Sequence, residues 1–124
     1  MIQYKGIAHN SLLVSRLEDS LVFYCDILGM TLDPSRPDLG YPGAWLNIGK
    51  QQIHLLQLES PDSIVNRPEH GGRDRHTAIL INGFNELKEM LVRANIDITL
   101  SKSGRRAIFC RDPDGNALEF ISTE

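Results

Sequence analysis

One order of patterns, a strand, a helix and three further strands, occurs twice along the 124 residues of this chain. In the first half, residues 6–14 alternate as in a strand, and residues 17–29 carry apolar side chains at helical spacing and end at Gly29. Shorter extended stretches follow at 30–32, 44–48 and 51–58, the last two joined as a hairpin. A chain of this length is expected to form one domain in which two small units share a core.

The second half restarts the same order after a segment rich in Pro, Gly and charge. HTAILI at 76–81 predicts a strand, and residues 84–94 predict a helix with Asn85 as its N-cap. Extended stretches are predicted at 97–100, 106–110 and 116–122, with the turn DPDG before the last.

The repeat predicts an α+β fold in a single domain over residues 1–124. Module one is expected at about 5–60, the linker at about 61–74 and module two at about 75–123.

Charge and hydropathy exclude several classes of partner. A net charge of −3 gives no reason to expect nucleic acid, and no apolar run has the length of a membrane helix. The first residues lack the pattern of a secretory signal, so a cytoplasmic location is expected. Cys25 and Cys110 lack the spacing of a redox or metal motif and are expected to be free thiols.

Four polar residues each lie inside an otherwise apolar predicted strand. His9 and His76 fall in the first strands of the two units, and His54 and Glu119 fall in the last strands. Burial of such groups is costly unless they share a partner, and three imidazoles with one carboxylate suit a divalent metal ion. Each residue alone also fits a simpler interpretation: a strand histidine is often half-buried and hydrogen-bonded, and alternation allows Glu119 to face water. His70, in the polar linker, is predicted to be solvated.

The chain resembles the vicinal oxygen chelate superfamily in its first strand and helix and in IHLL, RHTAILI and RDPDGNALEF. That superfamily includes glyoxalase I, fosfomycin resistance proteins, methylmalonyl-CoA epimerases and extradiol dioxygenases. The resemblance implies paired βαβββ modules that form a curved mixed sheet around a metal, usually with two chains combining their modules. It places the metal ligands at His9, His54, His76 and Glu119, and implies Ni, Co, Zn, Mn or Fe as the ion.

The resemblance implies a lyase or isomerase of the glyoxalase I type, in which the metal holds vicinal oxygens of a 2-oxo or thiol-adduct substrate and an enediolate forms. Four protein ligands leave two open positions on a six-coordinate ion, enough for one oxygen pair. An extradiol-type iron dioxygenase needs three open positions and is the alternative. A non-catalytic binding or resistance protein is the third interpretation.

Two departures from glutathione-dependent bacterial glyoxalases bear on the substrate. His54 stands where those enzymes carry a second carboxylate, and Leu13 stands near the position of the Arg with which they hold a glutathione carboxylate. The first change leaves the site with a net positive charge, which favours an anionic ligand and leaves Glu119, or a water held by the metal, as the base. Without that Arg, glutathione is not expected to be the thiol of the substrate adduct.

Further residues are candidates for contact with a small-molecule substrate, and an anionic one is favoured. Arginine suits a carboxylate or phosphate through paired hydrogen bonds, and aromatic side chains suit an apolar wall. The predicted contacts are Arg75, Lys102, Arg105, Trp45 and Phe109, with Arg73, Arg106 and Tyr41 as further candidates. A homodimer is expected from the resemblance, and neither nucleic acid nor membrane is expected as a partner.

Overall fold

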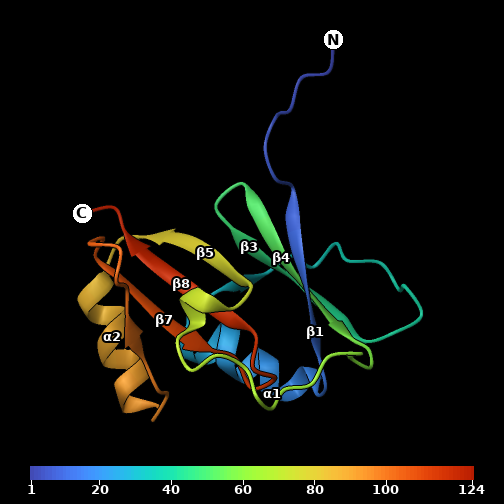
Figure 1. The fold of residues 1–124 in the computed structure, drawn as a ribbon. Coiled ribbons are helices and arrows are strands. Elements are labelled where there is room, and N and C mark those ends of the chain that lie inside the picture. Colours follow the sequence, from blue (N-terminus) through green and yellow to red (C-terminus); the bar gives the residue numbers. More distant parts are fainter.

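The computed structural model describes residues 1–124 and contains two four-stranded sheets (Figure 1). Sheet A has the order β1-β4-β3-β2, and sheet B has the equivalent order β5-β8-β7-β6. Sheet A consists of β1 (His9–Val14), β2 (Thr31–Leu32), β3 (Gly43–Ile48) and β4 (Gln51–Gln57). Sheet B consists of β5 (His76–Ile81), β6 (Thr99–Leu100), β7 (Ala107–Arg111) and β8 (Ala117–Ser122). In each sheet the first strand is parallel to the last, and the other pairs are antiparallel.

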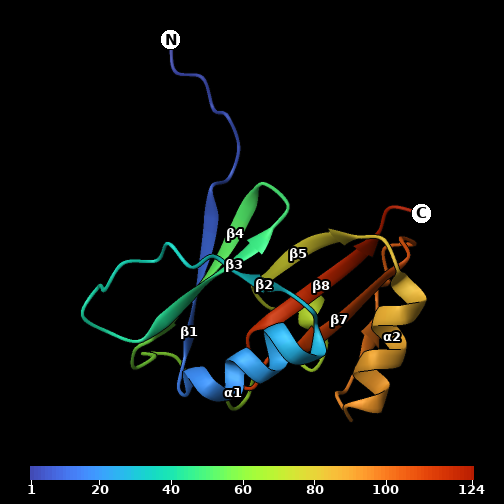
Figure 2. The same cartoon turned by 180° about the vertical axis from the view of Figure 1, so that it is seen from behind.

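The strand predictions hold apart from the beginning of the chain. The first strand begins at His9 rather than at residue 6, and residues 1–8 have no regular structure. This N-terminal segment extends away from the body of the molecule (Figures 1 and 2). None of the helices combines the length and apolar character needed to cross a membrane.

The first predicted helix consists of two parts. The α-helix α1 (Leu17–Leu21) continues as a π-helix (Val22–Ile27), and Gly29 then takes a left-handed conformation with φ of 74°. Glycine adopts this conformation without the steric cost that a Cβ imposes, which is why the helix ends there.

The prediction that Asn85 caps the second helix, α2 (Phe84–Arg93), was wrong. The N-cap is Gly83, in a left-handed conformation with φ of 81°. A carboxylate oxygen of Glu124 accepts a hydrogen bond from the Gly83 backbone N–H at 2.8 Å. Asn85 instead accepts a hydrogen bond from Arg106 at 2.8 Å. The free backbone donors at the helix start are therefore satisfied by a residue from the far end of the chain.

One hydrophobic cluster serves both sheets. Alternate residues of each strand point into it, for example Ile53 and Leu55 of β4 and Leu118 and Phe120 of β8. Phe23 of the π-helix belongs to the same cluster. Figure 2 shows α1 and its continuation lying across β8 and β7, so the helix of module one packs on the sheet of module two.

A buried polar cluster also joins the two modules. Tyr24, fully buried in the π-helix, donates a hydrogen bond to Asp112 at 2.7 Å. The Asp112 carboxylate also accepts from the backbone N–H groups of Asp114 and Asn116 and from the Asn116 side chain. Burial raises the pKa of Asp112 against the opposing effect of these hydrogen bonds. Asn116 further donates to the carbonyl of Leu13 at 3.1 Å, which ties the DPDG turn to β1.

The linker lies against the face of sheet B opposite to the core. Its only helical part is a 3-10 turn (Gly71–Arg73), which contacts β7 and β8 and lies in front of them in Figure 1. A Cβ at Gly71 would lie 3.2 Å from Phe109 and 3.4 Å from Ala117. The absence of a side chain at this position lets the linker approach the sheet this closely.

Candidate functional site

The four predicted metal ligands lie on the faces of the two sheets that point away from the core. On sheet A, His54 pairs with Ser11 of β1 and Trp45 of β3. On sheet B, Glu119 pairs in the same way with Ala78 of β5 and Phe109 of β7. Ser11 lies two residues after His9, and Ala78 lies two residues after His76. The two modules therefore place their candidate residues at the same register positions.

In module one the candidate ligands are two stacked imidazoles. The His9 and His54 ring centroids are 3.9 Å apart, with 13° between the ring planes. Trp45 stacks on the other side of His54 at 4.6 Å. The pKa of His54 is lowered, first by burial and then by the neighbouring His9 and Arg36. The lowered pKa favours the neutral form of His54, in which one ring nitrogen keeps a lone pair.

In module two the candidate ligands are an imidazole and a buried carboxylate. His76 Nε2 lies 3.3 Å from Glu119 Oε1, and the Glu119 side chain is only 2% exposed. The other oxygen, Oε2, is buried and has no hydrogen-bond partner. The nearest cation to it is the Arg105 guanidinium, with Nη2 at 3.6 Å. A buried carboxylate oxygen without a hydrogen bond is costly, so this position favours a bound cation.

The His76 ring is oriented by a backbone group. Its Nδ1 lies 2.9 Å from the carbonyl oxygen of Asp74. A carbonyl only accepts hydrogen bonds, so Nδ1 carries the proton and Nε2 faces Glu119. Phe109 contacts the same ring edge to face, at a centroid distance of 5.2 Å.

The structure brings the candidate ligands together as two pairs and not as a group of four. Within the chain, no three His, Cys, Asp or Glu side chains gather closely enough to hold a metal ion. The first strands of the two modules touch through Asn10, which donates to Thr77 at 2.5 Å. A cleft of about 820 Å³ lies between β1, the linker and the start of β5, and His76 is the only one of the four that lines it. The donor types and the free Glu119 oxygen fit a divalent ion, to which each pair would supply part of the ligands.

The predicted substrate contacts lie in three places. Arg105 lies beside Glu119, and Trp45 and Phe109 lie beside the candidate ligands of their own sheets. Arg75 lines the cleft and donates to Asp62 at 2.5 Å. The remaining candidates lie elsewhere. Lys102 and Arg73 are exposed, the Arg106 guanidinium lies over the ring of Phe84, and the Arg36 guanidinium lies over the ring of Tyr41.

The prediction that His70 is solvated was wrong. Its ring is half-buried, with Nε2 2.9 Å from the carbonyl of Leu100 and Nδ1 accepting from the Gly72 N–H at 3.0 Å. It also packs against Phe109 at 4.9 Å. The glycine pair that follows His70 lets the linker approach the sheet, which brings the ring onto Phe109. This pair was the one signal in the sequence for this arrangement.

Sequence reasoning also missed Asp74 and Arg111. Arg111 donates to the Asp74 carboxylate at 2.8 Å and to the carbonyls of Gly115 and Pro68. Arg67 pairs with the same carboxylate at 3.2 Å. Burial opposes ionisation of Asp74, but the hydrogen bond from Arg111 and the backbone N–H of Arg75 leave its pKa lowered. Only the alternating charges of the linker hinted at this network.

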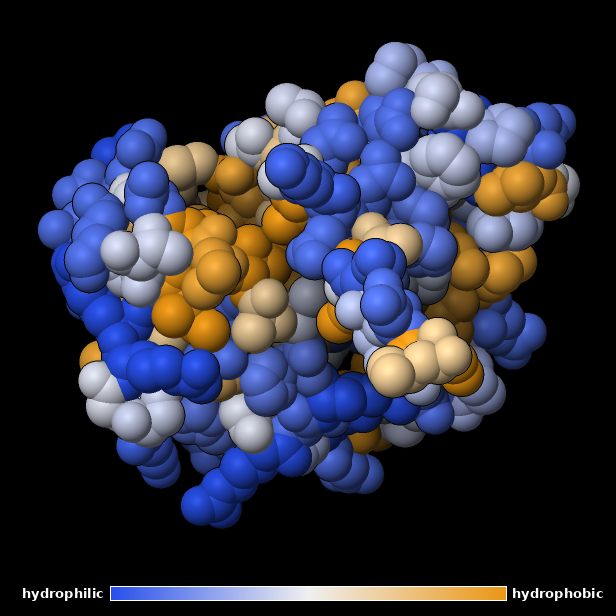
Figure 3. Space-filling model, turned by 90° about the horizontal axis from the view of Figure 1, so that it is seen from above, coloured by the Kyte–Doolittle hydropathy of each residue, from blue (hydrophilic) through white to orange (hydrophobic).

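Apolar side chains accompany the module-two pair on its sheet face. Seen from above, the half of the molecule that contains sheet B has an apolar patch with a hydrophilic margin (Figure 3). Leu80, on the same face of β5 as His76, is 69% exposed. This surface suits an apolar part of a ligand or of a second protein chain.

The chain is similar over most of its length to proteins of one family. The sequence model of the "Glyoxalase/Bleomycin resistance protein/Dioxygenase superfamily" matches residues 6–120. A lactoylglutathione lyase of Haemophilus influenzae is 30% identical over 125 residues, which cover 95% of this chain and 93% of that protein. Glyoxylase I 4 of Arabidopsis thaliana is 26% identical, over an alignment that covers 96% of this chain and 71% of that protein.

Solved structures have the same fold. A putative glyoxalase family protein from Bacillus anthracis superimposes with a TM-score of 0.81 at 25% identity, with both chains fully covered. A fosfomycin resistance protein from Listeria monocytogenes has a TM-score of 0.75 at 17% identity, over 96% of this chain and 91% of that chain. The predicted α+β fold of two repeated modules is confirmed.

Proposed function

We propose that this chain, which belongs to the glyoxalase/bleomycin resistance protein/dioxygenase superfamily, is a metal-dependent isomerase of the glyoxalase I type. Its substrate would be a small 2-oxo compound, such as the adduct of a thiol with a 2-oxoaldehyde. The observation that carries the proposal is Glu119, a buried carboxylate beside His76 with one oxygen that has no hydrogen bond. A cation at this oxygen would remove the cost of leaving it unpaired.

The metal site would be completed by a second copy of the chain. His9 and His54 form one pair of ligands, and His76 and Glu119 form the other. β1 and β5 both lie at an edge of their sheet, each with one side free of a strand partner. In a symmetric dimer, β1 of one copy would lie near β5 of the other, so that each pair of ligands meets its complement and two equivalent sites form.

The chemistry follows from the residues of the two pairs. When bound, a divalent cation supplies the Lewis acid that holds two adjacent substrate oxygens and stabilises an enediolate. Glu119, the only carboxylate in the set, would take the proton from the carbon beside the carbonyl and return it to the neighbouring carbon. His9, His54 and His76 would serve as neutral donors, in keeping with the lowered pKa of His54.

The residues around the pairs favour a substrate that carries an anionic group. The Arg105 side chain is 58% exposed and reaches Glu119 from a flanking loop, so it would hold a carboxylate or phosphate of the substrate. Lys102 lies in the same loop. Trp45 and Phe109, at equivalent register positions in the two modules, would form apolar walls.

A mixture of two inactive variants tests whether the site is shared. His9→Ala disables module one and Glu119→Ala disables module two. In a statistical mixture about half of the dimers contain one copy of each, and one of their two sites has both intact modules, so roughly a quarter of wild-type activity and metal binding should return. A site within one chain predicts no recovery, and mixing His76→Ala with Glu119→Ala, both in module two, is the matched control without recovery.

Turnover is tested on protein stripped of metal and then loaded with Ni, Co, Zn, Mn or Fe. We expect at least one of these ions to support isomerisation of a 2-oxoaldehyde–thiol adduct, measured by the rise in ultraviolet absorbance of the thioester product, and Glu119→Gln to abolish it. Oxygen uptake with a catechol in place of isomerisation would contradict the proposal and identify a dioxygenase of the extradiol type. Stoichiometric ligand binding without either reaction would identify a binding protein.

A further inference from the structure

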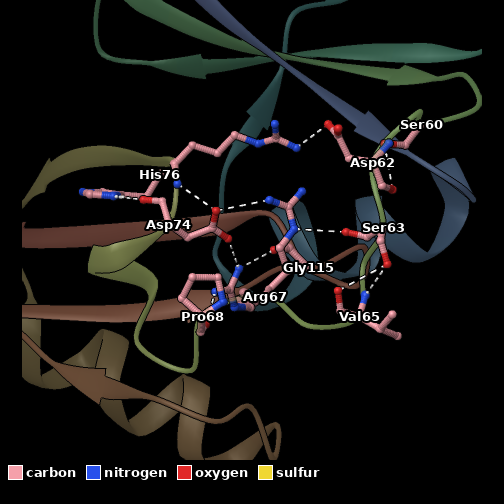
Figure 4. A network of polar contacts seen from close by, with 11 residues as sticks. Ser60, Asp62, Ser63, Val65, Arg67, Pro68, Asp74, His76 and Gly115 are labelled. Atoms are coloured by element: carbon pink, nitrogen blue, oxygen red, sulfur yellow. Dashed lines mark hydrogen bonds and ion pairs between the residues drawn. The ribbon is translucent and has the colours of Figure 1, made fainter.

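A network of polar residues beside the module-two pair connects the linker, the start of β5 and the turn before β8 (Figure 4). At its centre is Asp74, whose side chain is only 9% exposed. Its carboxylate is held by Arg67 at 3.2 Å and by Arg111 at 2.8 Å. Its backbone carbonyl faces Nδ1 of His76 at 2.9 Å. One residue therefore anchors the linker with its side chain and orients a proposed metal ligand with its main chain.

Arg111 reaches all three segments of the network. It donates to the carbonyl of Pro68 in the linker at 2.6 Å, to Asp74 and to the carbonyl of Gly115 in the turn at 2.7 Å. Its register partner on β8 is Ala117, and the register partner of Ala117 on β5 is His76. Arg111 and His76 thus stand in one row across three neighbouring strands, next to the row that contains Glu119.

Ala117, the small residue between Arg111 and His76, lets the linker come close to the sheet. Ala117 is 4% exposed and carries only a methyl group, and a Cβ at Gly71 would already lie 3.4 Å from it. The linker passes over Ala117, which places Asp74 in contact with both Arg111 and His76.

We infer that Asp74 and Arg111 are positioning residues for the proposed metal site: together they fix His76 with Nδ1 protonated and Nε2 directed at the ion, beside Glu119. This inference rests on the proposed function. The carboxylate of Asp74 does not touch the imidazole; it holds the carbonyl in place, and Arg111 holds both Asp74 and the turn that sets the register of Glu119. Partners that orient a ligating histidine in this way commonly change metal affinity about 10- to 100-fold when removed.

Ring nitrogen NMR on the metal-free protein gives the first readout. In alkaline buffer, the ¹⁵N shift of wild-type His76 Nδ1 should report a bound proton, because this nitrogen faces the Asp74 carbonyl. Asp74→Ala and Arg111→Met should populate the opposite tautomer, because the carbonyl is no longer held against Nδ1. Asp74→Asn keeps the shape and one acceptor oxygen, so it should shift the tautomer less than Asp74→Ala.

Metal affinity, measured by competition with a chelator for Zn²⁺, gives the second readout. We expect losses of about 10- to 100-fold for Asp74→Ala and Arg111→Met, and a smaller loss for Asp74→Asn. Arg93→Met on the exposed face of α2 is the matched control and should leave both the tautomer and the affinity unchanged. If Arg111→Met does not fold, the two Asp74 variants decide the question.

The outcomes separate this inference from the proposed function. Wild-type protein that binds no divalent metal contradicts the proposed function, and the tautomer measurement then still decides whether Asp74 and Arg111 fix the ring. Wild-type protein that binds metal, with variants that keep both its tautomer and its affinity, overturns the inference alone. Variants that only lower the melting temperature also overturn it, since they would show a role in stability without one in positioning.

Discussion

In module one, His9 and His54 are two stacked rings with His9 open to solvent, whereas in module two Glu119 is buried beneath the linker with His76 beside it. The strand register around the two pairs is the same. Trp45 is half-buried beside His54, but its counterpart Phe109 is only 5% exposed. The same strand arrangement in the two modules thus places its polar residues in two different environments.

The difference indicates a division of roles. Module two holds a buried anion that lacks a hydrogen bond on one oxygen and a histidine whose ring is fixed by a backbone carbonyl. We propose that this pair is preorganised for a cation. Module one adds neutral imidazole donors that are less constrained, so it would complete the coordination shell without setting its charge.

The largest expected effect is on metal affinity. Glu119→Gln removes the only carboxylate among the proposed ligands and should weaken divalent metal binding by at least about 100-fold, whereas His54→Gln should weaken it by about 10-fold. Chelator competition on both variants measures this difference. Equal losses would contradict the division of roles. In the metal-free state Glu119→Gln should unfold at no lower urea concentration than wild type, because it removes a buried charge.

The equivalent aromatic residues should differ in their contribution to stability. Phe109→Ala removes a fully packed ring and should lower the free energy of unfolding by about 3–4 kcal/mol. Trp45→Ala removes a half-buried ring and should cost about 1–2 kcal/mol. Urea denaturation of the metal-free variants measures both. A greater loss for Trp45→Ala would show that the open face of module one is covered in solution, as in a dimer.

The contact between the modules should affect stability without affecting either pair. Tyr24→Phe removes one hydrogen bond to the buried Asp112 and should lower the free energy of unfolding by about 1–2 kcal/mol. Metal affinity should stay at the wild-type value, since neither residue touches a proposed ligand. A loss of metal affinity would show that the contact between the modules also affects the proposed metal site.

The smallest effect is a dependence of stability on pH. Burial raises the pKa of Asp112 above its usual value of 3.8, so the folded chain keeps a proton that the unfolded chain releases. This contribution to the free energy of unfolding is present below the unfolded-state pKa and is lost as pH rises towards the raised value. Comparing wild type with Asp112→Asn across acidic pH isolates it. Wild type should gain stability relative to the variant as pH falls through this range.

Much of the fold and all four candidate ligands could be predicted from local pattern. The period of two in each strand, with the hairpin and the DPDG turn, places His54 and Glu119 on a defined face, and these signals lie within a few residues of each other. The repeated order of elements then relates His9 to His76. The N-cap of α2 and the burial of His70 escaped prediction, because Glu124 and Phe109, which decide them, are distant in sequence.

Local patterns along the chain set the two modules, the faces of their strands and the residue types that point from them, because alternation and turns depend on neighbouring residues. The folded structure was needed to show that the proposed ligands form two separate pairs, that Glu119 keeps an unpaired oxygen, and that Asp74, held by Arg111, places its backbone carbonyl against His76. These outcomes depend on how the linker packs on sheet B and how the modules share a core, which are contacts between residues far apart along the chain.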